Sequence, residues 1–101
     1  MLSRWRLCAL VLLAAARTSS AAAVEEVTSE AQFKKILSEH PAVVVDFYSQ
    51  TCGPCIMMAP IYKEVAKEFD GRLKLIKVDV QRSHVGVQIR SMPTFHFYLQ
   101  V

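Results

Sequence analysis

The chain has 101 residues, of which 52% are hydrophobic, and its formal net charge is +3. A chain of this length has room for one domain and excludes a multidomain organisation. Three of its twelve Lys and Arg lie in the first 23 residues, and the other nine balance nine Asp and Glu. A neutral remainder of this kind argues against nucleic acid binding.

Residues 1–23 predict an N-terminal targeting segment. Arg4 and Arg6 precede an apolar run over 7–16, and three alanines at 21–23 offer a small-residue cleavage site. This layout is typical of a secretory signal peptide and predicts the secretory pathway or secretion. The run is shorter than the roughly 20 residues of a membrane-spanning helix, so no membrane contact is expected after removal of the leader. A mitochondrial presequence, rich in Arg and Ser without acids, and an uncleaved anchor are the alternatives.

Residues 24–101 are predicted to form the domain. Ser29 and Gln32 match a helix capping box, and the helix that they begin is expected to end before Pro41. The next segment, Ala42–Tyr48, is β-branched and aromatic on both faces, which predicts a central strand covered on both sides.

A second helix is predicted from about Pro54 to Phe69, with Pro60 kinking it and Gly71 as a left-handed end. Its apolar face is expected to consist of Met58, Ile61, Tyr62, Val65 and Phe69.

Two more strands are predicted, Arg72–Val80 and Met92–Val101, joined by a connection over 81–90 with one short helical turn. The order strand, helix, strand, connection, strand indicates an α/β domain with a parallel βαβ core.

Cys52 and Cys55 are spaced C-x-x-C, and three kinds of site have this spacing. Zinc needs four ligands, and none of the three histidines, His40, His84 and His96, lies at ligand spacing from another. A structural disulfide would close a very small loop and would constrain the unfolded chain little. A redox pair fits the position best, because a helix N-terminus after a buried strand lowers the pKa of the first thiol from about 8.5.

The segments VDFYSQTCGPCIMMAPIYKEVAKEF, KVDV and SMPTF resemble the thioredoxin family over about Val27–Tyr98. The resemblance implies an α/β, thioredoxin-like fold with a central mixed sheet and flanking helices. Family members continue with an edge strand and a final helix, so it also implies a domain that is truncated at the C-terminus. The connection between Lys77 and Pro93 is about three residues shorter than is typical, which implies that a third helix is reduced to a turn.

The resemblance also implies roles for individual residues. Asp46 is expected to be buried and to help take the proton of Cys55, with Lys77 as its partner. Pro93 is expected to be cis and to face the cysteines, and the Met92 backbone is expected to pair with a substrate chain.

The turn itself is expected to contact the substrate through Thr51, Gly53 and Pro54. Thr51 stands where the family has tryptophan, so part of an apolar docking surface is missing, and its hydroxyl is hypothesised to hydrogen-bond near the Cys52 thiolate. The Gly-Pro pair between the cysteines resembles that of reducing thioredoxins.

These features imply a thiol–disulfide oxidoreductase that reduces protein disulfides, with Cys52 as nucleophile and Cys55 as resolving cysteine. The expected partners are disulfide-containing proteins and a reductase that donates electrons, with no bound cofactor and no metal. A disulfide oxidase or isomerase of the secretory pathway, and a non-catalytic binding module or fragment, are the alternatives.

Overall fold

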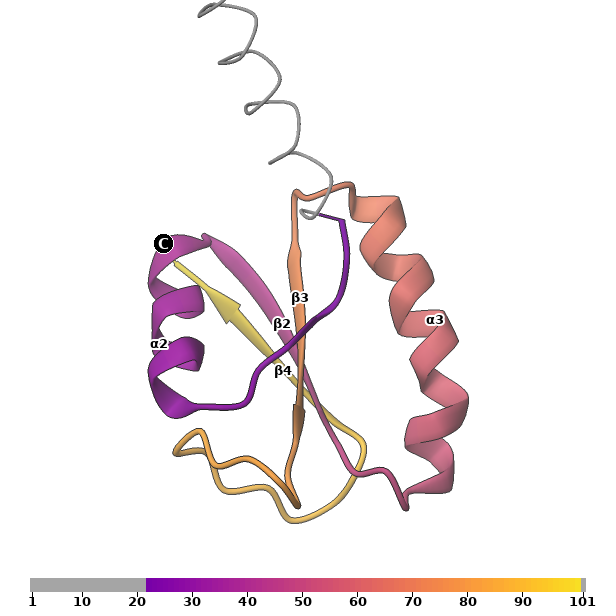
Figure 1. Cartoon of the computed structure of the whole chain (residues 1–101). Helices are drawn as coiled ribbons and strands as arrows, with labels where there is room; N and C mark the ends of the chain where they lie inside the picture. The colour runs from indigo at the N-terminus through magenta and orange to yellow at the C-terminus, as the bar shows by residue number, and fades with distance from the viewer. Residues whose placement is uncertain (1–21, 101) are drawn as a thin grey trace, which may run out of the picture.

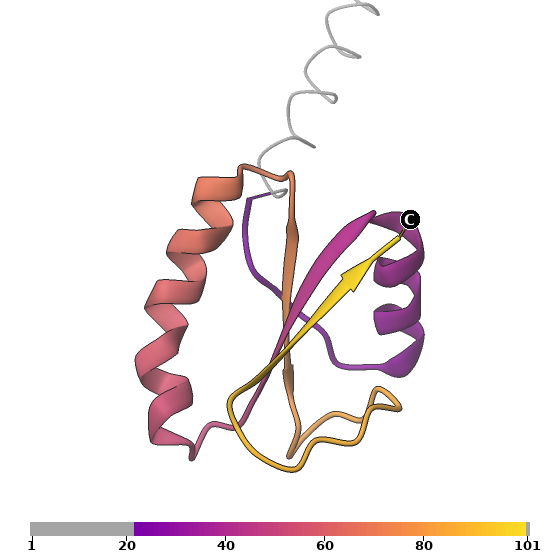
Figure 2. The same cartoon turned by 180° about the vertical axis from the view of Figure 1, so that it is seen from behind.

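The computed structural model describes residues 22–100, which form one four-stranded sheet with a helix on each face (Figure 1, Figure 2). The sheet order is β1-β3-β2-β4, in which β1, β3 and β2 are parallel and β4 is antiparallel to β2. The predicted mixed sheet with flanking helices is confirmed, while most of the predicted leader lies outside the described residues. The elements are β1 (Glu25–Glu26), α2 (Glu30–Glu39), β2 (Ala42–Tyr48), α3 (Gly53–Phe69), β3 (Lys74–Asp79) and β4 (Thr94–Leu99).

Helix α2 begins where the capping residues predict. Ser29 Oγ accepts a hydrogen bond from the Gln32 N–H (3.2 Å), and Gln32 Oε1 accepts one from the Thr28 N–H (3.0 Å). The Gln32 side chain thus bonds to the residue before the N-cap, and the N–H groups of Thr28 and Gln32 both have a hydrogen-bond partner. Phe33 and Ile36 are buried against the sheet.

Strand β2 has the predicted bounds and lies at the centre of the core. Its alternate side chains point to opposite faces, because successive residues of a strand do so. Val43, Val45 and Phe47 pack in the cluster that contains Phe33 and Ile36 of α2. The other face carries Val44, which packs with Tyr62, Ala66 and Leu75 under α3. The same alternation directs Asp46 toward α3.

Helix α3 contacts the sheet along a narrower stripe than predicted, made of Cys55, Tyr62 and Ala66. The prediction that Ile61 and Phe69 are buried is wrong, because their side chains are 57% and 39% exposed. The stripe is set by Tyr62, whose hydroxyl donates to the carbonyl oxygens of Val44 (2.9 Å) and Ile76 (2.8 Å) in the sheet. This anchor turns the neighbouring Ile61 toward solvent.

Several boundaries differ from the prediction. The left-handed end of α3 falls at Asp70 (φ 47°), one residue before Gly71 (φ 81°). Strand β1 was not predicted, since it consists of two glutamates whose backbone pairs with β3. The connection over 81–90 contains no helix, and a single hydrogen-bonded turn at its start agrees with the predicted reduction of a helix to a turn. There the Asp79 carbonyl accepts from the Arg82 (3.1 Å) and Ser83 (2.8 Å) N–H groups, and Asp79 Oδ1 accepts from the Gln81 N–H (3.0 Å).

Strand β4 lies at the edge of the described sheet and pairs there with β2. It is shorter than predicted, and it leaves Phe97 and Leu99 77% and 74% exposed on the α3 side. Across residues 22–100, none of the helices has the length and apolar character that a membrane crossing requires.

Candidate active site

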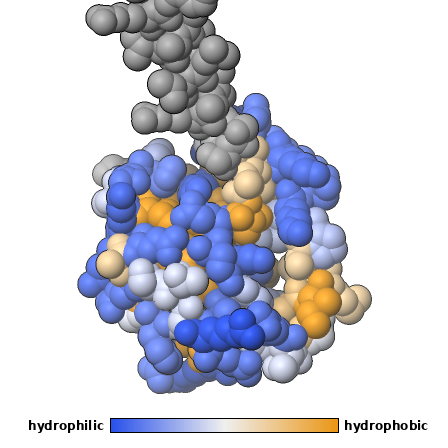
Figure 3. Space-filling model, viewed as in Figure 1, coloured by the Kyte–Doolittle hydropathy of each residue, from blue (hydrophilic) through white to orange (hydrophobic). Residues whose placement is uncertain are grey.

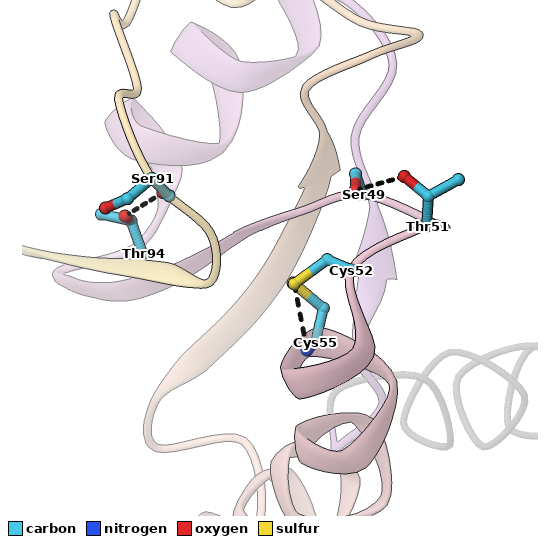
Figure 4. The surroundings of a disulfide bond; sticks show 6 residues. All are labelled: Ser49, Thr51, Cys52, Cys55, Ser91 and Thr94. Atoms are coloured by element: carbon cyan, nitrogen blue, oxygen red, sulfur yellow. Dashed lines mark hydrogen bonds between the residues drawn. A yellow bond between two sulfur atoms is a disulfide. The ribbon is translucent and has the colours of Figure 1, made fainter.

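The two cysteines lie where β2 ends and α3 begins, and they form a disulfide (Figure 4). Cys52 is the N-cap of α3, and its Sγ accepts a hydrogen bond from the Cys55 N–H at 3.3 Å. Cys52 is partly exposed, whereas Cys55 is only 3% exposed. A thiolate at Cys52 would therefore meet the N–H groups and positive dipole end of the helix, which favour its charge.

The turn before the helix is held by hydrogen bonds to Ser49 on its inner side, and its outer side is exposed. Ser49 is buried, its carbonyl accepts from the Cys52 N–H (3.3 Å), and its hydroxyl lies 3.3 Å from that of Thr51 (Figure 4). A hydrogen bond from Thr51 to a Cys52 thiolate stays a prediction, because the sulfur is in a disulfide here. A Cβ added at Gly53 would meet nothing within 4 Å, and Pro54 is exposed. The outer side of the turn is thus open to a substrate.

Asp46 lies buried beneath the turn, as the resemblance implied. Its side chain is 4% exposed, and Oδ1 has no hydrogen-bond partner among residues 22–100. Burial raises the pKa of this carboxyl to about 6. The positive charge of Lys77 lowers the pKa in part, and the negative charge of Glu26 raises it slightly. Asp46, Cys55 and Lys77 border one cavity of about 40 Å³, which is large enough for a water molecule. The carboxyl and the inner cysteine therefore face a common space.

Lys77 is directly opposite Asp46 in the pairing of β3 with β2. Its Nζ lies 5.5 Å from the centroid of the Tyr48 ring, and the Tyr48 hydroxyl donates to Glu26 Oε1 at 2.5 Å. Burial and this bond to Glu26 raise the pKa of Tyr48. Sequence reasoning missed Tyr48 and Glu26 as neighbours of the site, because their contact depends on the unpredicted strand β1.

The segment around Pro93 comes to the same edge of the sheet. Thr94 is opposite Phe47, so the beginning of β4 lies beside the end of β2. Ser91 and Thr94 belong to the surroundings of the disulfide, and the Thr94 hydroxyl donates to the Ser91 carbonyl at 2.6 Å (Figure 4). The Met92–Pro93 peptide bond is cis, which confirms the prediction. The bond from Thr94 to Ser91 and the pairing of Thr94 with Phe47 thus hold this peptide bond at the edge of the sheet where β2 leads into the cysteine turn.

Residues 22–100 contain no group of three or more His, Cys, Asp or Glu side chains placed to hold a metal ion. His96 instead packs edge-on against the Phe47 ring, with the ring centroids 5.0 Å apart.

Comparison with known proteins agrees with this geometry. The profile of the Thioredoxin family matches residues 23–100. "Thioredoxin 1" of Plasmodium falciparum is 45% identical over 78 residues, which are 74% of each chain. "Thioredoxin 1" of a Nostoc species is 35% identical over 75% of this chain and 74% of its own.

Solved structures give the same result. Plasmodium falciparum thioredoxin superposes with a TM-score of 0.71 at 42% identity, over 75% of this chain and 76% of its own. Oxidised mitochondrial thioredoxin 3 of Saccharomyces cerevisiae gives a TM-score of 0.71 at 26% identity, over 76% and 74%. The matched residues 23–100 include every candidate site residue named above. The chain therefore belongs to the thioredoxin family of protein-disulfide reductases, and its close cysteine pair is Cys52 and Cys55.

Proposed function

We propose that this chain reduces disulfide bonds in proteins, with Cys52 as the attacking and Cys55 as the resolving cysteine. The observation that carries the proposal is the contrast between a partly exposed Cys52 at a helix N-terminus and a buried Cys55 one turn further on. In the dithiol form, the Cys52 thiolate attacks one sulfur of a substrate disulfide. A Cys52–substrate disulfide forms, and the other substrate sulfur leaves as a thiolate.

The second step uses the buried carboxylate. Asp46, with a pKa of about 6, is mostly ionised at neutral pH and accepts the Cys55 proton across the shared cavity. The Cys55 thiolate then attacks Cys52 Sγ, the substrate leaves with its second thiolate, and the Cys52–Cys55 disulfide remains. Two electrons have passed from the dithiol to the substrate, and the disulfide seen here corresponds to this oxidised form.

The reaction requires partners outside the chain. Disulfide-containing proteins are the substrates, and a reductase returns two electrons to the Cys52–Cys55 disulfide. The exposed turn and the Met92 backbone are proposed to receive the substrate chain as an added strand. The apolar run in residues 1–23 supports transport into the secretory pathway, and delivery of a fluorescent fusion of this segment to mitochondria would instead support the alternative.

The test compares Cys55→Ser with Cys52→Ser, both in a 101-residue chain that also carries Cys8→Ser, with insulin as substrate. Cys55→Ser is expected to accumulate an insulin adduct by mass spectrometry, whereas Cys52→Ser should form none. Titration of the wild-type dithiol against glutathione then gives the direction of electron flow. A reduction potential of about −270 mV for the Cys52–Cys55 pair supports a reductase, and one of about −120 to −180 mV would support an oxidase or isomerase. Wild-type protein that fails to reduce insulin would contradict the proposal.

A further inference from the structure

The first turns of α3 carry large apolar side chains that the fold leaves uncovered. Ile56, Met57 and Ile61 are 60%, 76% and 57% exposed. The surface over this part of α3 is hydrophobic in Figure 3. No charged residue occurs between Asp46 and Lys63 in the sequence, so the cysteine turn and these helical turns are uncharged throughout. An exposed apolar patch with no role in the core indicates an interaction surface.

The position of Ile56 ties this surface to the reactive sulfur. Its N–H donates to the Cys52 carbonyl at 3.2 Å, and residues four apart lie on one face of a helix, so Ile56 follows Cys52 by one turn. Ile56 also borders a groove of about 230 Å³ whose other walls include Gln50 and Cys55. A protein segment whose sulfur reaches Cys52 therefore comes close to this groove and to Ile56.

We propose that Ile56 and Met57 form a docking surface for an apolar side chain next to the disulfide of a protein substrate. The inference rests on the proposed function and assigns part of its substrate preference. A charged neighbour would lose water here without gaining a partner, whereas an apolar neighbour gains from burial. Met57 is unbranched and adapts to side chains of different shape.

In the sequence, Ile56 and Met57 follow the cysteine pair, whereas the small polar Thr51 precedes it. Thr51 is exposed and its hydroxyl contacts Ser49, so it offers little apolar area to a substrate. The apolar contact is thereby displaced from the residue before Cys52 to the residues after Cys55. Ile56 and Met57 are specificity-determining residues in this arrangement and take no part in the exchange of electrons.

The test uses two synthetic peptides of equal length, each with one cysteine joined to thionitrobenzoate as a mixed disulfide. Leucine flanks the cysteine in one peptide and serine flanks it in the other. The Cys52 thiolate attacks the peptide sulfur, coloured thionitrobenzoate leaves, and Cys55 then frees the peptide thiol. The reduced 101-residue chain, with Cys8→Ser so that Cys52 and Cys55 are its only thiols, is compared with the same chain carrying Ile56→Gln or Met57→Gln. Leu99→Gln is the matched control, since Leu99 is 74% exposed and pairs with Ala42 at the opposite end of β2.

Wild-type protein is expected to favour the leucine peptide about tenfold in the second-order rate constant of thionitrobenzoate release, through burial of the added apolar area. Each glutamine variant should reduce this ratio severalfold, while its rate with 5,5′-dithiobis(2-nitrobenzoate), which has no flanking residues, stays within about twofold. Leu99→Gln should change neither value. Equal rates with both peptides in the wild type, or an undiminished ratio in both glutamine variants, would overturn the inference alone. A wild-type dithiol that reacts with none of the three disulfides would overturn the proposed function itself.

Discussion

Asp46 and Cys55 border the same cavity of about 40 Å³, although one belongs to β2 and the other to α3. The alternation of β2 directs Asp46 to the α3 face, and the first turn of α3 carries Cys55 to the space above it. Burial raises the pKa of the Asp46 carboxyl to about 6 from its usual value of 3.8. The charge of this group therefore changes in the pH range just below neutrality, and it also affects the stability of the fold.

Replacement of Asp46 by asparagine is expected to stabilise the disulfide form at pH 8. A raised pKa means that the folded protein holds the proton more tightly than the unfolded chain, so this group costs stability as the pH rises from about 4 to 6, and the cost persists above. Two pKa units correspond to about 3 kcal/mol, which is the upper limit of the gain from Asp46→Asn at pH 8. Below pH 4 the gain should vanish. Urea unfolding at pH 3.5 and pH 8 measures both values.

Glu68→Gln is the control for this prediction, because Glu68 lies exposed on α3. It should leave the difference between the two pH values as in the wild type. An equal gain for Asp46→Asn at both pH values would mean that the raised pKa is not its cause. Asp46→Asn should also slow the resolving step of catalysis, so that the Cys52–substrate adduct lives longer at pH 7 than in the wild type.

Lys77 and Glu26 are expected to move the pKa of Asp46 in opposite directions. The lysine charge lowers this pKa and the glutamate charge raises it. Lys77→Met should therefore shift the titration of the Asp46 carboxyl to a higher pH, and Glu26→Gln should shift it to a lower one. Carbon-13 NMR of the Asp46 carboxyl between pH 4 and 9 reports each midpoint. Shifts of the same sign in both variants would show that rearrangement, and not charge, dominates.

The Tyr62 hydroxyl is expected to contribute more to stability than that of Tyr48. Tyr62 is 6% exposed and its hydroxyl bonds to two backbone carbonyls of the sheet, whereas the bond from Tyr48 to Glu26 is exposed. Tyr62→Phe should lower the free energy of unfolding by about 1–2 kcal/mol, and Tyr48→Phe by under about 1 kcal/mol. Urea unfolding of both variants at pH 7 decides. Equal losses would count against the anchoring role of Tyr62.

Gly86 is the glycine at which a side chain should be most harmful. Its φ is 80°, and an added Cβ would come to 2.7 Å from Glu30 Oε1. Gly86→Ala should cost about 1–2 kcal/mol, mostly through backbone strain, because the Glu30 side chain can move aside. Gly53→Ala is the control, since the space around that Cβ is open, and it should be close to neutral. Thermal unfolding of the disulfide form compares the two.

Local patterns were enough to predict the elements that depend on neighbours in the sequence. The bounds of Ala42–Tyr48 and the cap at Ser29 follow from side-chain pattern and spacing alone, and both are confirmed. Glu25–Glu26 was missed because nothing in two glutamates favours a strand, and only the pairing with β3 makes one. The prediction that Ile61 is buried was wrong, because helical spacing gives only the width of an apolar face. Contact with the sheet through Tyr62 decides which part of that face is covered.

The site divides in the same way. Cys52 and Cys55 were singled out from their spacing and position, and the buried Asp46 and the cis Pro93 from the resemblance to the family. The hydrogen bond from Tyr48 to Glu26 joins residues 22 positions apart, and no local pattern reports such a contact. Exposure of Ile56 likewise depends on the rotation of α3 against the sheet.

The place of β4 beside β2 also determines when the parts of the site come together during synthesis. Thr94 is made about 40 residues after Cys52, which takes a few seconds at roughly 5–20 residues per second. The cysteine pair and its helix are joined by local contacts, whereas the turn at Pro93 reaches them only once β4 has paired with β2. A nascent chain can therefore hold a reactive thiol before it can orient a partner strand. Thiol reactivity therefore comes first in synthesis, and the proposed pairing of a substrate backbone with Met92 has to wait until β4 has joined β2.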